Sequence, residues 1–162
     1  MRKRRILKEN AMYHVGARIN NKEMLLKSNE LKALFLAVVK RAKKKYIFQL
    51  TNFVVMENHI HMIIKPGKNQ NLSRIMQWVL SVFAVICNKK LGRSGHLWGE
   101  RFFSKIISSL QEYIKISDYI DNNPIKAGLA SGEKVWKFSG KYHRLVKKYS
   151  ILENPEALAL LF

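Results

Sequence analysis

Residues 56–64 read Met-Glu-Asn-His-Ile-His-Met-Ile-Ile, and this stretch constrains the fold more than any other part of the sequence. Its apolar, β-branched character predicts a strand, in which successive side chains point to opposite faces of a sheet. We therefore expect His59 and His61 on one face and the alternate residues, beginning with Ile60, on the core face. Two imidazoles side by side on a strand form half of a divalent-metal site. A His-x-His pattern is weak evidence by itself, because structural histidines are common, so the rest of the chain must supply further ligands.

The apolar periodicity of the chain predicts strands and helices in the order β-α-β-β-α-β-α. The expected strands cover residues 11–19, 46–56, 59–64 and 97–107, and the expected helices follow Ser28, Pro66-Gly67 and Ser109. This order predicts an α+β fold, with an antiparallel sheet in a βαββαβα ferredoxin-like arrangement and helices packed on one face. We expect one domain over residues 1–162, with a core of about 11–146, a basic N-terminal arm and a short C-terminal helical tail.

The chain is strongly basic, with 30 Lys and Arg residues against 11 Asp and Glu and a net charge of +19. Such an excess predicts a polyanionic partner, most commonly nucleic acid. A membrane surface is the alternative, because the lysine-rich end of the 31–45 segment partly fits a basic amphipathic helix. The candidates for contacts with a nucleic-acid backbone form two basic runs: Arg2, Lys3, Arg4 and Arg5, and then Lys40, Arg41, Lys43, Lys44 and Lys45.

No apolar run approaches the roughly 20 residues that a membrane-spanning helix needs, so we expect no membrane span. The single cysteine, Cys87, cannot form an internal disulfide and fits a reducing compartment. These features predict a cytoplasmic location, and the basic charge adds association with the nucleoid.

The last predicted helix begins with a capping box, in which Ser109 and Glu112 stand three residues apart. At about 100° per residue, Tyr113 falls on the apolar stripe of this helix, which is made up of Leu110, Tyr113, Ile114 and Ser117. Tyr113 is therefore predicted to be a core residue.

A second tyrosine on this helix, Tyr119, points away from that stripe, and Asn123 lies one turn further along the same face. Pro124 disfavours helical geometry at the preceding residue, so the helix is predicted to end near Asn123. Simple solvent exposure is one explanation for Tyr119 and Asn123, and a functional role is the other.

Together these residues can form a reactive centre. Two imidazoles and one amide oxygen can hold a cation and leave positions for water and a phosphate oxygen. A phenol beside them could act as a nucleophile, although with its ordinary pKa near 10 it is only about one part in a thousand ionised at neutral pH. His14, His96 and His143 have no paired ligand spacing, and we expect structural or surface roles for them.

Two further blocks of sequence resemble a known family. Residues 119–129 (Tyr-Ile-Asp-Asn-Asn-Pro-Ile-Lys-Ala-Gly-Leu) are similar to its Tyr-Ile-x-x-Asn-Pro-Val-[Arg/Lys]-Ala-Gly-Leu block. Residues 97–103 (Leu-Trp-Gly-Glu-Arg-Phe-Phe) resemble its Leu-Trp-x-x-Arg-Phe strand. With His59-Ile60-His61 they resemble the HUH single-tyrosine transposases of the smallest bacterial insertion sequences, most closely the REP-associated tyrosine transposases. The resemblance spans about residues 11–146.

The resemblance implies an HUH endonuclease fold and a single-stranded DNA endonuclease and strand transferase. Tyr119 would attack a phosphodiester, become linked to the 5′ phosphate and release a 3′-OH. His59, His61 and Asn123 would ligate Mg²⁺ or Mn²⁺, with Asn123 at a place where mobile members often carry Gln. The expected partner is single-stranded or hairpin DNA. The resemblance leaves a monomer and a homodimer both open, because in mobile relatives the tyrosine helix often comes from the partner subunit.

Two other functions fit the same sequence. The sheet could belong to a non-catalytic protein that binds single-stranded nucleic acid. Alternatively, the site could be that of a metal-dependent phosphodiesterase that uses water as nucleophile and forms no covalent adduct.

Overall fold

The computed structural model describes residues 4–158, and its long elements follow the order expected from the sequence. Four antiparallel strands form one sheet in the order β2-β3-β1-β4. The strands are Met12–Arg18 (β1), Phe48–Val55 (β2), His59–Pro66 (β3) and Phe103–Ile107 (β4). The helices are Asn29–Lys45 (α1), Leu72–Leu91 (α2), Leu110–Lys126 (α3), Gly140–Leu145 (α4) and Pro155–Leu158 (α5), with 3-10 turns at Asn20–Lys22 (η1) and Leu25–Lys27 (η2). The predicted α+β class and ferredoxin-like order are confirmed.

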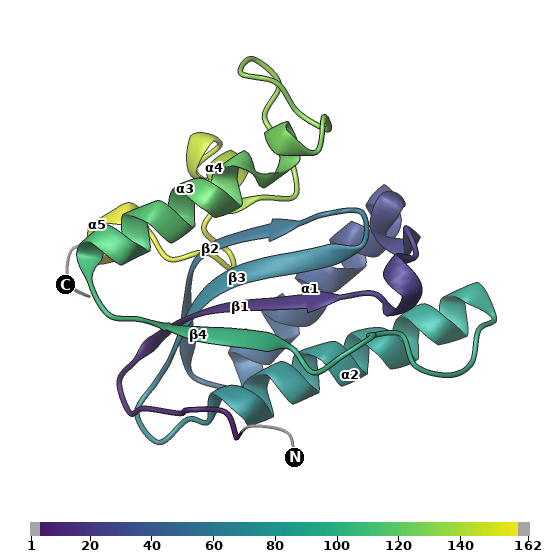
Figure 1. Cartoon of the computed structure of the whole chain (residues 1–162), viewed down its shortest axis with the longest axis horizontal. Helices are drawn as coiled ribbons and strands as arrows, with labels where there is room; N and C mark the ends of the chain where they lie inside the picture. The colour runs from purple at the N-terminus through teal and green to yellow at the C-terminus, as the bar shows by residue number, and fades with distance from the viewer. Residues whose placement is uncertain (1–3, 159–162) are drawn as a thin grey trace.

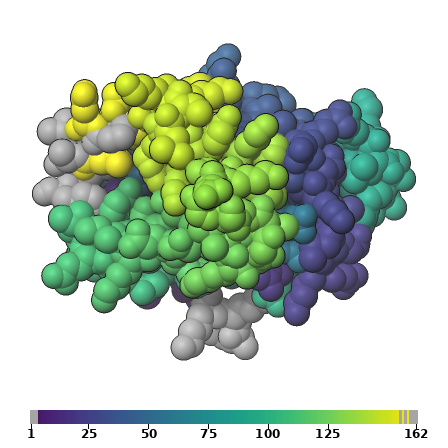
Figure 2. Space-filling model, turned by 90° about the horizontal axis from the view of Figure 1, so that it is seen from above, coloured from purple at the N-terminus to yellow at the C-terminus, as the bar shows by residue number. Residues whose placement is uncertain are grey.

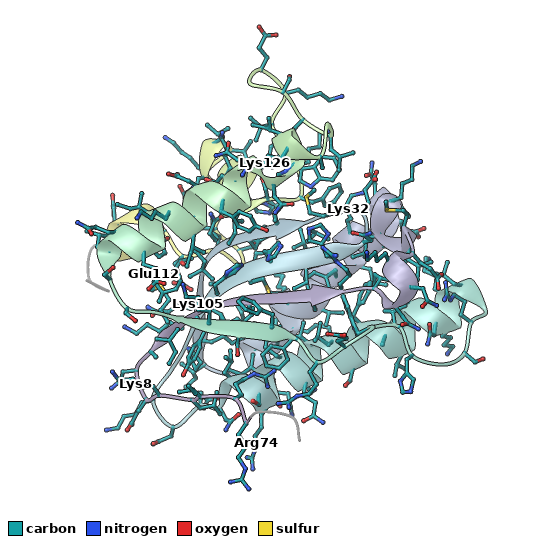
Figure 3. All side chains as sticks on the ribbon, viewed as in Figure 1. Lys8, Lys32, Arg74, Lys105, Glu112 and Lys126 are labelled. Carbon is teal, nitrogen blue, oxygen red and sulfur yellow. The ribbon has the colours of Figure 1, made fainter. Side chains whose placement is uncertain are left out.

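Helix boundaries follow from capping side chains. The hydroxyl of Ser28 accepts a hydrogen bond from the Leu31 amide at the start of α1, as the sequence predicts. The Ser109 hydroxyl accepts from the Glu112 amide at the start of α3, which confirms the expected helix start. The carboxylate of Glu112 also binds Lys105 of β4 at 2.6 Å, so the first turn of α3 is tied to the edge of the sheet (Figure 3).

Helices cover both faces of the sheet (Figure 1). Helices α1 and α2 pack on one face, where the main core includes Ile60, Met62 and Ile64 of β3. Helix α3 packs on the opposite face over a smaller core that includes Ile63. The expectation of helices on one face holds for α1 and α2, whereas α3 lies across the sheet from them. The face that α3 covers also carries His59 and His61, because side chains alternate along β3 and Ile63 lies on that face.

A bulge in β2 changes which residues face α3. The register of the β2–β3 pair shifts between Leu50 and Asn52. Leu50 before the bulge and Phe53 after it both face the main core, so Asn52 turns toward α3 instead. The buried amide of Asn52 donates hydrogen bonds to the Ser117 hydroxyl at 2.8 Å and to the Asp121 carboxylate at 3.0 Å. The middle of α3 is therefore fixed to the sheet by polar contacts.

Helix α4 completes this polar network. Arg144 donates to the carboxylate of Asp121 at 2.9 Å and to Asn52 Oδ1 at 3.3 Å. Gly140 starts α4 directly against Asn52, where a β-carbon would collide with the amide oxygen. Seen from above, α3 and the chain that follows it, in green to yellow, cover the left and centre of this face, and earlier parts of the chain are visible on the right (Figure 2).

Two predicted boundaries are wrong. The fourth strand begins at Phe103 and not at residue 97, because the chain pairs only briefly, at Trp98 with Ile19, and then bends. Helix α3 does not end near Asn123 but continues to Lys126. Pro124 lies inside this helix with its ring buried, and its carbonyl accepts hydrogen bonds from the amides of Leu129 and Ala130 in the following loop. In the part of the chain that the structure describes, no helix is long and apolar enough to cross a membrane.

Candidate active site

The two histidines of β3 lie on the face that α3 covers, which confirms that they share a face. Across the ladder, His59 pairs with Arg18 of β1 and His61 pairs with Gly16. Both imidazoles line a groove of about 750 Å³, together with the end of β1, the turn η1 and the chain entering β4. Tyr119 of α3 lines the same groove.

Tyr119 and Tyr113 occupy different environments, as their helical phase predicts. The Tyr119 side chain is 42% exposed, and its ring centroid lies 5.5 Å from that of His61 in an edge-on contact. Tyr113 is buried in the smaller core. The predicted stripe is partly wrong, because Leu110 and Ile114 are half exposed. The buried stripe of α3 consists of Tyr113, Ile120 and Pro124.

The hydrogen bonds around His59 determine which ring nitrogen carries the proton. The amide of Asn58 donates through Nδ2 to the carbonyl of Lys22 at 3.1 Å, which turns its Oδ1 toward His59 Nδ1 at 2.8 Å. An amide oxygen only accepts, so Nδ1 of His59 is the protonated nitrogen. The lone pair on Nε2 then faces the Oδ1 atom of Asn123 at 3.4 Å. Two acceptor atoms that face each other suit a cation between them.

A third histidine, which the sequence prediction assigned to a structural or surface role, joins this cluster. His14 of β1 is 8% exposed, and its Nε2 lies 3.0 Å from His61 Nδ1. The two are 47 positions apart, so no local spacing in the sequence signals the contact. The strand pairing creates it, because His14 lies two residues before Gly16, the β1 partner of His61, and therefore on the same face of the sheet.

The environment keeps these imidazoles neutral. Burial is the main cause that lowers the pKa of His61, to about 3, and the neighbouring His14, His59 and Arg18 add to it. Burial also lowers the pKa of His59, with Arg18 as the second cause, and the pKa of His14, with Lys105 as the second cause. A neutral imidazole has the free lone pair that metal coordination requires.

The donor set for a cation is small. Among residues 4–158, no three His, Cys, Asp or Glu side chains converge as metal ligands. The available donors are His59, His61 and the amide oxygen of Asn123, which contacts His59 from α3. Imidazole nitrogens with one amide oxygen fit Mn²⁺ better than Mg²⁺, which prefers oxygen ligands.

Two cations near Tyr119 and the histidines were not among the predicted site residues. The ammonium of Lys126 lies 5.7 Å from the Tyr119 ring centroid, at the end of α3 (Figure 3). The extra turn of α3 beyond Asn123 brings it there. Arg18 lines the groove beside His59. Both cations lie where a phosphate near Tyr119 would meet positive charge.

The predicted basic N-terminal arm is partly engaged within the protein. Arg5 donates to the Phe102 carbonyl at 2.6 Å and to the hydroxyls of Ser104 and Ser73, and its guanidinium lies 3.5 Å from the centroid of the Phe102 ring. Arg4 is exposed at the β4 edge. Arg2 and Lys3 lie outside the described residues.

The second basic run, at the end of α1, lies on the opposite face of the sheet from the groove. Lys43 binds Glu153 at 2.5 Å and the carbonyl of Ile151, so its charge is already paired. The other members of the run are exposed: Lys40, Arg41, Lys44 and Lys45.

Sequence comparison assigns the family. Residues 7–123 match the family described as "Transposase IS200 like", a stretch that contains the two β3 histidines, Tyr119 and Asn123. This chain belongs to the IS200-like transposase family. Within the family, it is 25% identical over 123 residues to a Haemophilus influenzae protein named as a REP-associated tyrosine transposase, covering 70% of this chain and 69% of the relative. The general activity that family membership implies is the cleavage and transfer of DNA.

Solved structures of transposases share the fold. A REP-associated tyrosine transposase bound to a REP hairpin superposes with a TM-score of 0.77 at 20% identity, over 91% of this chain and 86% of that one. A transposase from Deinococcus radiodurans superposes with a TM-score of 0.53 at 16% identity, over 75% of this chain and 97% of that one. These similarities support the HUH arrangement of the sheet and helices.

Proposed function

We propose that this chain is a single-stranded DNA endonuclease and strand transferase that cleaves hairpin-associated DNA through a covalent bond to Tyr119. The observation that carries the proposal is the edge-on contact of the half-exposed Tyr119 ring with His61 at the groove. The +19 charge supports a DNA substrate, and the REP-associated relatives support hairpin DNA. We expect such a protein to lie in the cytoplasm and to associate with the nucleoid.

The reaction needs only one nucleophile and one leaving group. The Oη atom of Tyr119 forms a bond to phosphorus, the bond from phosphorus to the 3′ oxygen breaks, and the phenolic proton is lost while the 3′ oxygen gains one. The downstream strand stays on the protein through its 5′ phosphate. A 3′-OH can reverse the step, so strands are joined without an external source of energy.

The residues around Tyr119 have separate tasks in this proposal. His59, His61 and Asn123 would hold Mn²⁺ or Mg²⁺, and the chemistry that such a cation supplies is polarisation of the scissile phosphate. Lys126 and Arg18 would bind the neighbouring phosphates, and the exposed ring of Phe103 in the groove would stack on a base.

One chain contains all of these groups, since Tyr119 contacts His61 within it. We therefore propose that the chain can act without exchanging α3 with a partner, as a monomer or within a homodimer. Several of the basic residues predicted to contact the DNA backbone are exposed: Arg4, Lys40, Arg41, Lys44 and Lys45.

Trapping the covalent species separates this proposal from its alternatives. Hairpin DNA with a single-stranded flank is labelled at its 3′ end or at its 5′ end, mixed with the protein and Mn²⁺, and run on a denaturing gel. We expect the 3′ label to move with the protein and the 5′ label to appear on a shorter free strand. A water-using phosphodiesterase would give shorter DNA with no adduct, and a binding protein would give neither.

Variants of the two histidines test their role in the same assay. His59→Ala and His61→Ala should abolish the adduct and leave hairpin binding nearly unchanged, because affinity comes mainly from backbone charge. Equal loss of binding and cleavage would contradict a role at the scissile phosphate.

A further inference from the structure

The ring of His61 lies over a position in the neighbouring strand that has no side chain. Gly16 is the β1 partner of His61, and a β-carbon on Gly16 would lie 3.0 Å from His61 Nδ1. That distance is tighter than ordinary van der Waals contact, so any larger residue would push the imidazole away. Because residue 16 is glycine, the His61 ring can lie across β1 and reach His14.

The contact between His61 and His14 is short and enclosed. His61 Nδ1 and His14 Nε2 are 3.0 Å apart, which requires a proton on one of the two nitrogens. The His14 ring is buried and has edge-on contacts with the rings of Phe103 at 5.5 Å and Tyr119 at 6.1 Å. His14 therefore has little freedom to turn away from His61.

The direction of this hydrogen bond decides whether His61 can act as a ligand. If His61 donates from Nδ1, its Nε2 keeps a lone pair. If His14 donates instead, neutral His61 carries its proton on Nε2 and cannot bind a cation there. His59 shows the first arrangement, because Asn58 Oδ1 accepts from its Nδ1.

We propose that His14 is a positioning residue that accepts a hydrogen bond from His61 Nδ1 and so holds His61 in the tautomer and orientation that coordinate the cation through Nε2. This inference rests on the proposed function of the site, in which His61 is a metal ligand. Outer partners of this kind orient the ligating imidazole and fix its tautomer, and their loss commonly weakens metal binding by about 10- to 100-fold.

The tautomer can be read without metal or DNA. Long-range proton–nitrogen NMR spectra of the full-length, metal-free protein, labelled with nitrogen-15, distinguish Nδ1–H from Nε2–H in each histidine. We expect His61 as the Nδ1–H tautomer in the wild type and as a mixture in His14→Leu. A wild-type His61 that carries its proton on Nε2 would overturn the proposal.

Metal affinity gives the second measurement, with electron paramagnetic resonance used to count free Mn²⁺ during a titration. His14→Leu and Gly16→Ala should each bind Mn²⁺ about 10- to 100-fold more weakly than the wild type. His14→Gln places an amide that can accept from Nδ1 and should restore most of the affinity. Saturating Mn²⁺ should restore cleavage to His14→Leu.

These results separate the inference from the proposed function. Unchanged Mn²⁺ affinity in His14→Leu, or a wild type that binds no Mn²⁺, overturns the role of His14 even if a DNA adduct forms. Weaker Mn²⁺ binding in His14→Leu supports that role even if the wild type forms no adduct with DNA. A loss of thermal stability with no loss of Mn²⁺ affinity would mean that His14 only packs the sheet.

Discussion

Arg144 of α4 binds Asp121 of α3 at 2.9 Å. Asp121 lies two residues after Tyr119 in the sequence. The side chains of Arg144 and Asp121 are largely buried, and Asp121 also accepts from Asn52 of the β2 bulge. Helix α3 is therefore held to the sheet by a polar cluster on one side while Tyr119 lies at the open groove. The position of Tyr119 depends on groups that never touch the groove.

We expect Arg144→Met to lower the free energy of unfolding by about 2 kcal/mol, because it leaves the Asp121 carboxylate without its cation in a partly buried site. It should also slow adduct formation, since α3 loses one of its attachments. Chemical denaturation and the denaturing-gel assay measure the two effects. Lys148→Met is the matched control, because it removes an equal charge from an exposed position three residues after the end of α4. If both variants behave alike, the cluster does not position α3.

The stability of the metal-free protein should depend on pH through its buried histidines. Burial lowers the pKa of His14 and His59, and that of His61 to about 3, whereas histidines of the unfolded chain titrate near 6.5. As pH falls from about 6.5 toward 3, the unfolded state takes up protons that the folded state does not. The contribution of these neutral histidines to the free energy of unfolding is therefore complete above about pH 6.5. The free energy of unfolding decreases as pH falls through this window.

Each such histidine contributes a slope of at most about 1.4 kcal/mol per pH unit. Urea unfolding in EDTA between pH 7.5 and pH 4.5 measures the slope. His61→Gln removes one titrating group and should make the dependence shallower. Stability that rises on acidification would contradict the burial of neutral histidines.

Two adjacent arginines should separate folding from DNA binding. Arg5 is hydrogen-bonded to β4 and α2, whereas Arg4 is exposed beside it. We expect Arg5→Met to lower the melting temperature and Arg4→Met to leave it unchanged. Arg4→Met should instead weaken binding of a single-stranded flank and make the salt slope shallower by about 0.7. The opposite pattern in melting and salt-titration experiments would show that Arg5, and not Arg4, contacts DNA.

The alternation of side chains along a strand was enough to place His59 and His61 on one face of the sheet, because it depends only on local backbone geometry. The capping residues Ser28 and Ser109 likewise marked their helices correctly. The edge of the stripe on α3 was not predictable, because apolar character alone does not show that Leu110 and Ile114 stay half exposed.

Features that depend on strand register were missed. The contact of His14 with His61 arises from pairing between β1 and β3, and the turn of Asn52 toward α3 arises from a bulge. Neither leaves a pattern in neighbouring residues. The position of Lys126 was missed for another reason, since α3 continues through Pro124, which local preference alone disfavours.

We expect Tyr119, and not Tyr113, to become linked to DNA. Trypsin places the two tyrosines on different peptides, because it cuts after Lys105, Lys115 and Lys126. The protein is allowed to react with hairpin DNA and Mn²⁺, digested with nuclease and trypsin, and examined by mass spectrometry. We expect the mass of a residual nucleotide phosphate on peptide 116–126 and none on peptide 106–115. Tyr119→Phe should lose it, whereas Tyr113→Phe should keep it. A nucleotide on peptide 106–115, or an adduct that persists in Tyr119→Phe, would contradict the proposed mechanism.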